Sequence, residues 1–145
     1  MTSHKEKIMA IQVCELHHVG FAVPKRQVDA MRDFYQQVFG LRADPSRWNI
    51  PDVPGCFLDV EDARQLHVLG SDGVSRYAQG PERDPVSNHV AFTVASLEAA
   101  AEELRSRGVD FFSQRSVAAD RLTQLFLRDP AGNLLELRQA APAAD

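Results

Sequence analysis

The sequence predicts an α+β fold made of two βαβββ modules, whose strands form one cupped, mixed sheet with the helices outside it. Two observations lead to this prediction. The segment His18–Val23 recurs as His89–Val94, with His, Val, Phe and Val matched at four of six positions and an offset of 71 residues. Each copy is followed by an amphipathic helical pattern that ends at a glycine, and then by short β-type segments.

The first module spans about residues 12–70. After its copy of the repeated strand, apolar residues recur at helical spacing until Gly40, a residue type that often follows the end of a helix. This apolar stripe consists of Val28, Met31, Tyr35 and Val38. β-type segments are expected at 41–48, 55–60 and 64–69, so the order of elements is β-α-β-β-β.

The second module, about residues 86–140, repeats this order. Ser96 is suited to cap a helix that Gly108 ends. The helical stripe consists of Leu97, Ala100, Ala101 and Leu104, and the β-type segments lie at 109–115, 121–128 and 133–138. Asp129-Pro130-Ala131-Gly132 has the composition of a type I turn between the last two strands.

The two modules are expected to form a single domain over residues 12–140. Residues 71–85 contain two Gly and two Pro among charged residues, which is typical of an exposed crossover. Residues 1–11 are expected to be a flexible tail and residues 141–145 a loose C-terminus. Because a module of about 60 residues buries only about 60% of its surface, the two are expected to pair and share a concave surface.

Composition narrows the possible partners of the chain. Its 145 residues include 16 Lys and Arg against 20 Asp and Glu, a formal net charge of −4, and no basic run exceeds two residues. Nucleic acid and membrane binding are therefore not expected, because both normally require clustered basic charge. No apolar stretch is long enough for a signal peptide or a membrane span, so we expect a cytoplasmic protein.

Alternation along the repeated strand predicts a cavity on one side of the sheet. In both copies a histidine, His18 or His89, shares one face with small residues. The opposite face carries Val19, Phe21 and Val23 in the first copy and Val90, Phe92 and Val94 in the second. We expect the apolar face to pack on the helices and the histidine face to line a ligand cavity. His17 has the opposite parity and is matched by Asn88, which predicts a structural role.

The last strand of each module adds a polar side chain among apolar neighbours. His67 lies 49 residues after His18, and Glu136 lies 47 residues after His89, so the two occupy equivalent places. A carboxylate within an apolar strand is costly unless it is paired or bound to a metal. Together the four residues offer three imidazoles and one carboxylate, a donor set that suits Zn, Ni, Fe, Co or Mn.

These motifs resemble the vicinal oxygen chelate superfamily, also called the glyoxalase/bleomycin-resistance/dioxygenase family, and in particular its glyoxalase I-like members. The matching segments are Leu16–Gly20, Gln65–His67, Asn88–Phe92 and Asp129–Leu137, with Phe34-Tyr35 ahead of Gly40-Leu41 as a further similar pair. The resemblance runs from about Glu15 to Gln139, nearly the whole expected domain. The order and spacing of the motifs are specific for the superfamily but weak for the reaction.

The resemblance implies two βαβββ modules that enclose a divalent metal ion, often in a homodimer. Members hold two neighbouring substrate oxygens at open coordination positions, where the metal acts as a Lewis acid. Glyoxalase-type members carry a carboxylate at the place of Glu136, which can leave the metal and serve as the base. They usually carry Glu or Gln in place of His67, a departure that fits metal binding but argues against authentic lactoylglutathione lyase activity.

We therefore predict a metal-dependent lyase or isomerase resembling glyoxalase I, which chelates vicinal oxygens of a small substrate and stabilises an enediolate-type intermediate. The predicted metal ligands are His18, His67, His89 and Glu136, and Glu136 is also the candidate catalytic base. Gln65 and Arg138 share the predicted inner face and are candidates for substrate contact, although Arg138 also suits a surface position at the strand end. The expected assembly is a homodimer.

Other members of the superfamily supply the alternatives. An extradiol-type dioxygenase uses two His and one carboxylate on Fe(II), and His67 would fill a position that such a site leaves open. A fosfomycin-modifying transferase needs a cluster of cations and hydroxyls, which the sequence does not show. A bleomycin-resistance-like dimer would sequester its ligand without metal. Trp48 and the acidic balance fit that interpretation, but the intact ligand set argues against it.

Overall fold

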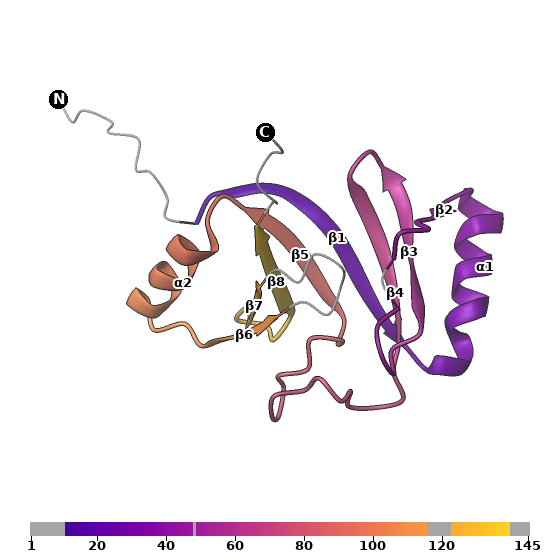
Figure 1. Cartoon of the computed structure of the whole chain (residues 1–145). Helices are drawn as coiled ribbons and strands as arrows, with labels where there is room; N and C mark the ends of the chain where they lie inside the picture. The colour runs from indigo at the N-terminus through magenta and orange to yellow at the C-terminus, as the bar shows by residue number, and fades with distance from the viewer. Residues whose placement is uncertain (1–10, 48, 116–122, 140–145) are drawn as a thin grey trace.

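The computed structural model describes residues 11–47, 49–115 and 123–139. These residues form one eight-stranded sheet with an α-helix at each end of the molecule (Figure 1). The sheet is mixed and open, so the predicted α+β architecture of two βαβββ modules is confirmed. Trp48 and the expected tails, except for Ile11, lie outside the described residues.

The first module contains β1 (Val13–Val23), a short 3-10 helix (Lys25–Gln27), α1 (Val28–Phe39), β2 (Arg42–Ala43), β3 (Gly55–Glu61) and β4 (Arg64–Gly70). The second module contains β5 (His89–Val94), α2 (Leu97–Ser106), β6 (Phe111–Arg115), β7 (Thr123–Arg128) and β8 (Leu134–Gln139). Within the described chain, no helix is long and apolar enough to cross a bilayer.

The two modules meet at the centre of the sheet, where β1 and β5 pair in antiparallel orientation. The strand order is β2-β3-β4-β1-β5-β8-β7-β6. Each central strand also pairs in parallel with the last strand of its own module, β1 with β4 and β5 with β8. The repeated strands and the last strands of both modules, which carry the predicted site residues, are therefore the four neighbouring strands at the centre.

Each helix packs on the strands of its own module. In α1, Val28, Met31 and Tyr35 pack in one cluster with apolar residues of β3 and β4. Val38 was expected on the same stripe but is 61% exposed, because the packed part of the stripe ends at Tyr35. Gly40 takes φ 69° and donates its N–H to the Gln36 carbonyl, which ends the helix as predicted.

The second helix follows its prediction closely. The Ser96 hydroxyl accepts a hydrogen bond from the Ala99 N–H at 3.1 Å and caps α2. Ala100 and Leu104 are buried and pack with residues of β5, β7 and β8. The chain then turns at Gly108, which adopts a positive φ of 68°.

The predicted strand at 41–48 is much shorter than expected. Only Arg42 and Ala43 pair with β3. Asp44 then forms a local turn, in which its carboxylate accepts hydrogen bonds from the Ser46 N–H at 2.9 Å and the Ser46 hydroxyl at 2.7 Å. Pro45 follows Asp44 and has no N–H to continue the ladder. The loop that results reaches the concave side of the sheet.

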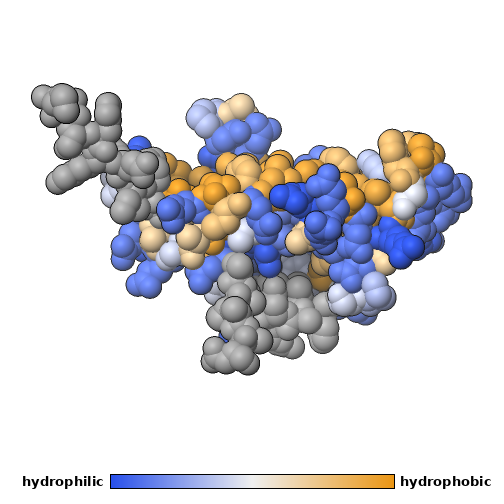
Figure 2. Space-filling view, turned by 90° about the horizontal axis from the view of Figure 1, so that it is seen from above, coloured by the Kyte–Doolittle hydropathy of each residue, from blue (hydrophilic) through white to orange (hydrophobic). Residues whose placement is uncertain are grey.

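The helices cover only the two ends of the outer face. Val23 packs with the α1 cluster and Phe92 and Val94 pack with the α2 cluster. Val19 and Phe21 were expected to pack on a helix but belong to neither cluster and stay partly exposed on the central strand. Seen from above, hydrophobic residues form a band across the molecule (Figure 2).

Candidate metal centre

Three adjacent strands bring His18, His89 and Glu136 together. His18 lies on β1, His89 on β5 and Glu136 on β8, and these strands are neighbours in the sheet. Ala91 of β5 is the register partner of both His18 and Glu136, so these two side chains flank it from opposite sides. All three are buried, with exposed fractions of 4% for His18, 6% for His89 and 3% for Glu136.

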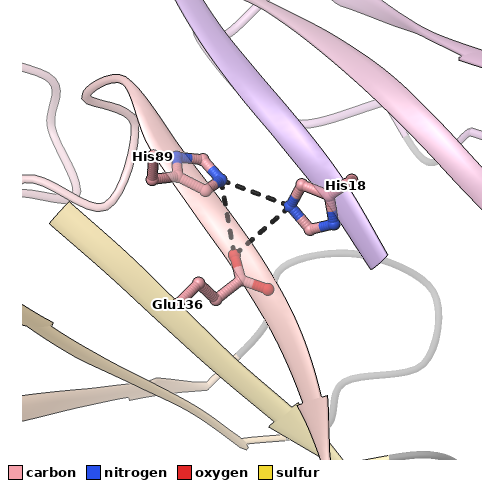
Figure 3. Close-up of side chains that lie close together, drawn as sticks. All are labelled: His18, His89 and Glu136. Carbon is pink, nitrogen blue, oxygen red and sulfur yellow. Dashed lines mark hydrogen bonds and ion pairs between the residues drawn. The ribbon is translucent and has the colours of Figure 1, made fainter. Parts of the chain in front are cut away.

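Their donor atoms converge on one point (Figure 3). The His18 and His89 Nε2 atoms are 3.3 Å apart, and the Glu136 Oε1 atom lies 3.6 Å from the first and 3.5 Å from the second. A point equidistant from these three atoms in their plane is about 2.0 Å from each, the length of a zinc–nitrogen or zinc–oxygen bond. The arrangement therefore fits a divalent metal ion.

A glycine makes room for one of the rings. Gly20 and His89 are register partners in β1 and β5. A Cβ atom at position 20 would lie 2.5 Å from the His89 Cε1 atom, so any side chain there would displace the ring. The pairing of a histidine with a glycine across the central strands is thus a steric requirement of the site.

Hydrogen bonds at the far side of each ring orient the two imidazoles. The His89 Nδ1–H donates to the Ser87 carbonyl at 2.7 Å, which leaves the Nε2 lone pair free to face the site. The His18 Nδ1 atom lies 2.7 Å from the Nδ1 atom of His17, so one of these two nitrogens donates to the other. Such partners commonly fix the tautomer and orientation of metal-binding histidines.

The structure places His17 on the cavity side of the sheet, not on the opposite face that strand alternation gave it. The register of β1 against β5 shifts between Leu16 and His18, which marks a bulge or irregularity in the strand. The simple alternation of faces fails at such a shift, and His17 and His18 both line the same cavity. In the sequence, the signal for this arrangement is the presence of two adjacent histidines, which strand alternation would place on opposite faces. In the structure the His17 ring contacts the His18 ring.

His67 lies beside the three-residue group without being part of it. Its ring stacks on that of His18 at 3.8 Å between centroids and on that of Phe57 at 3.5 Å. The His67 Nε2–H donates to the Gln65 side-chain oxygen at 2.9 Å, and the described group of converging donors comprises only His18, His89 and Glu136. A role of His67 as a fourth ligand stays a prediction, and it requires the ring to turn away from Gln65.

Burial shapes the protonation of the site. Desolvation is the largest influence on Glu136 and by itself would raise its pKa. The hydrogen bond and charge of His18, the charge of His89 and a hydrogen bond from Gln124 outweigh it, so the pKa is lowered to about 2. Desolvation lowers the pKa of His67 and of His89. At neutral pH the site therefore holds an ionised carboxylate and neutral imidazoles at His67 and His89, the forms that bind metals.

The three donors lie in a cavity of about 330 Å³ between the two modules. Its apolar wall includes Ile50, Val53, Phe57, Leu69, Val86 and Phe126. Gln65 and Arg138, both predicted on the inner face, line it as well. Arg138 donates to the Thr93 hydroxyl at 3.2 Å, while the Gln65 amide donates to Asp44 and Asp59. Arg47, which the sequence did not single out, also lines the cavity.

Comparison with known proteins agrees with this architecture. The chain is similar to the methylmalonyl-CoA epimerase of Mycobacterium tuberculosis, with 24% identity over 94% of this chain and 95% of that one and a TM-score of 0.70. It is similar to a variant of the Streptomyces coelicolor methylmalonyl-CoA epimerase in complex with 2-nitronate-propionyl-CoA, with 22% identity over 92% and 99% and a TM-score of 0.69. Both comparisons show a shared fold.

A catechol 2,3-dioxygenase has the same fold over part of its length, with 23% identity, a TM-score of 0.59 and coverage of 89% of this chain but 42% of that one. No curated relative matches the chain significantly. The sequence profile of one family matches residues 15–137, which include His18, His89 and Glu136. The chain therefore belongs to the Glyoxalase/Bleomycin resistance protein/Dioxygenase superfamily.

Proposed function

We propose that this protein is a metal-dependent lyase or isomerase, which removes a proton next to a carbonyl or hydroxyl group of a small substrate and returns a proton to the resulting enediolate-type intermediate. The observation that carries the proposal is the convergence of His18, His89 and Glu136 within one cavity. When bound, a divalent metal supplies Lewis-acid polarisation of two neighbouring substrate oxygens. The reaction is redox-neutral, so it needs no oxidant or reductant.

In this proposal Glu136 has two roles. Its Oε1 atom faces the two histidines as a donor, and its carboxylate is ionised and able to accept a proton. Its low pKa makes it a weak base while both histidines remain beside it, so proton removal is expected to require the carboxylate to move off them. Apolar side chains of Phe57 and Phe126 line the cavity beside it.

The epimerase neighbours support the type of reaction. Inverting a carbon next to a carbonyl requires removal of a proton and its return to the opposite face. A fold that accommodates an epimerase, with a buried carboxylate among histidines, suits this chemistry. We propose His67 as a further ligand or as a support for His18, and metal affinity of a His67→Gln variant distinguishes the two.

One observation favours a ring-cleaving dioxygenase as the second candidate. The converging group is two histidines and one carboxylate, the set that holds non-haem Fe(II) in many oxygenases, and His67 points its Nε2–H at Gln65 instead. A metal-free ligand-sequestering dimer is the third candidate, and it gives no account of three buried donors at metal-binding distances.

An assay in deuterium oxide separates these candidates. Protein loaded with Zn, Ni, Co or Mn is incubated with a methylglyoxal hemithioacetal or a malonyl-type thioester, and protein loaded with Fe(II) with catechol under air. The proposal expects metal-dependent deuterium incorporation at the carbon next to the carbonyl, observed by NMR, and its loss in Glu136→Gln. Oxygen uptake with catechol and no deuterium incorporation would instead establish the dioxygenase.

We also propose that the protein is a homodimer. Val13 and Leu16 of β1 are 54% and 45% exposed, and α1 exposes Phe34, Val38 and Phe39 by 51%, 61% and 61%. Hydrophobic residues form a band across the upper side of the molecule (Figure 2), a feature common at interfaces between subunits. A second copy would cover this surface.

A further inference from the structure

The cavity contains an arginine that has no acidic partner among the described residues. Arg47 lies in the loop between β2 and β3, and its guanidinium donates to the Val53 carbonyl at 3.1 Å. Its buried Nε atom has no hydrogen-bond partner among the described residues. Burial lowers the pKa of the Arg47 guanidinium.

This cation is connected to the metal centre by stacked rings. The Arg47 guanidinium lies over the Phe57 ring at 5.1 Å, and the Phe57 ring stacks on His67 with an angle of 11° between planes. His67 in turn stacks on His18. Arg47 therefore lies at one end of a row of side chains whose other end is a donor of the metal centre, and both ends line one cavity.

The nearby polar side chains do not neutralise Arg47. The same loop has two acidic residues, and both have other partners. Asp44 accepts hydrogen bonds from Ser46 and Gln65, and Asp52 pairs with Lys25. Arg138, the other cavity arginine, has the Thr93 hydroxyl as a partner. A half-buried guanidinium without a counter-ion carries a desolvation cost, which a bound anion would offset.

A second unsatisfied atom lies in the same cavity. Among the described residues, the buried side-chain nitrogen and oxygen atoms without a hydrogen-bond partner are the Arg47 Nε atom and the Gln114 Oε1 atom. Both residues line the cavity, Arg47 from the first module and Gln114 from the second. Unsatisfied buried polar groups are rare in native proteins, so both atoms indicate a polar ligand in this cavity. A carboxylate can accept from the Arg47 Nε–H, whereas the Gln114 Oε1 atom is itself an acceptor and needs a donor group elsewhere on the ligand.

We propose that the substrate carries a carboxylate group that binds Arg47, in addition to the vicinal oxygens held at the metal centre. The binding of vicinal oxygens at the metal centre rests on the proposed function, whereas the carboxylate site rests on Arg47 alone. A carboxylate fits because the guanidinium presents parallel N–H donors to two oxygens in one plane. Arg47 carries one positive charge, which matches the single negative charge of a carboxylate.

Matched chelating probes test the proposal. Hydroxamates bind a divalent metal through two neighbouring oxygens, and a series HONH–CO–(CH₂)n–COOH with n from three to six is compared with the corresponding terminal amides. Binding to zinc-loaded protein is measured by calorimetry. For at least one spacer length the acid is expected to bind about tenfold or more tightly than the amide, since hydrogen bonds to charged groups are the stronger kind.

Variants identify the group responsible. Arg47→Met keeps the stem over Phe57 and is expected to abolish the preference for the acid while the affinity for the amide is retained. Arg105→Met is the matched control, because Arg105 also lies over a phenylalanine ring, Phe111 at 5.4 Å, but outside the cavity. Equal affinities for acid and amide at every spacer length, or a preference that survives in Arg47→Met, would overturn the proposal.

A measurement without metal separates this proposal from the proposed function. Glutarate and glutaramide are titrated into metal-free protein, and the Arg47 Nε–H resonance, assigned with an Arg47→Lys variant, is followed by NMR. Glutarate is expected to shift this resonance and glutaramide to leave it in place. A shift by glutarate together with no hydroxamate binding would uphold the anion site and reject the chelating metal centre. Absence of any shift would reject the anion site itself.

Discussion

His18 and His89 both direct their Nε2 atoms toward the metal centre, but their Nδ1 atoms have different hydrogen-bond partners. The His89 Nδ1–H donates to the Ser87 carbonyl, whereas the His18 Nδ1 atom shares a hydrogen bond with the imidazole of His17. A carbonyl can only accept a hydrogen bond, so the tautomer of His89 is determined by the fold. The tautomer of His18 depends instead on that of His17, whose pKa is lowered to about 4, chiefly by burial.

Replacing His17 with Phe is expected to lower metal affinity about 10- to 100-fold, the usual cost of losing an outer partner of a ligand. His17→Gln retains a side-chain acceptor and is expected to lose less. Competition with a chromophoric chelator measures both affinities. An unchanged affinity in His17→Phe would show that the contact between the two rings has no part in positioning His18.

The stability of the metal-free protein is expected to fall as the pH is lowered from 7 to 4. The pKa values of His17, His67 and His89 are lowered from 6.5 in the folded protein, so the unfolded chain takes up protons first and is stabilised relative to the folded state. Below about pH 4.5 Glu136 adds to the loss, since its folded pKa is about 2. Urea unfolding at several pH values measures this, and constant stability across the range would contradict it.

At the scale of elements, the repeat predicted the strands and helices well because the signals involved are local. Alternation, the Ser96 cap and the glycine at the end of each helix depend on neighbours in the chain. The register shift that turns His17 into the cavity depends on the partner strand, and the loop that carries Arg47 is held by Gln65 of β4, which donates to Asp44. Those residues were therefore missed, although the ligand candidates His18, His89 and Glu136 were found.

The fit between β1 and β5 leads to a prediction at this scale. Gly20→Ala places a Cβ atom against the His89 ring and is expected to reduce metal binding strongly. Ser96→Ala is the control, since losing the helix cap costs about 1 kcal/mol of stability without touching the site. Calorimetric metal titration and thermal unfolding of both variants separate the effects. Equal metal affinity in the two variants would contradict the steric argument.

The whole molecule consists of two half-sheets whose helices lie at opposite ends. The centre of the outer face is left without a helix, and the metal centre and Arg47 share one cavity between the halves. We expect a homodimer that Leu16→Glu weakens, because a charge would be buried at the interface. Light scattering over a range of concentrations measures this, with exposed Val74→Glu as the control. A wild-type monomer at all concentrations would contradict the expectation.

The central claim is that His18, His89 and Glu136 together hold one divalent metal ion. The most direct test is elemental analysis of protein purified without a histidine tag and dialysed after loading with Zn, Ni, Co, Mn or Fe(II) in turn. We expect close to one ion per chain for at least one of these metals, and its loss in His18→Ala and in Glu136→Ala variants that remain folded by circular dichroism. No retained metal in the wild type, or undiminished metal in both variants, would contradict the account.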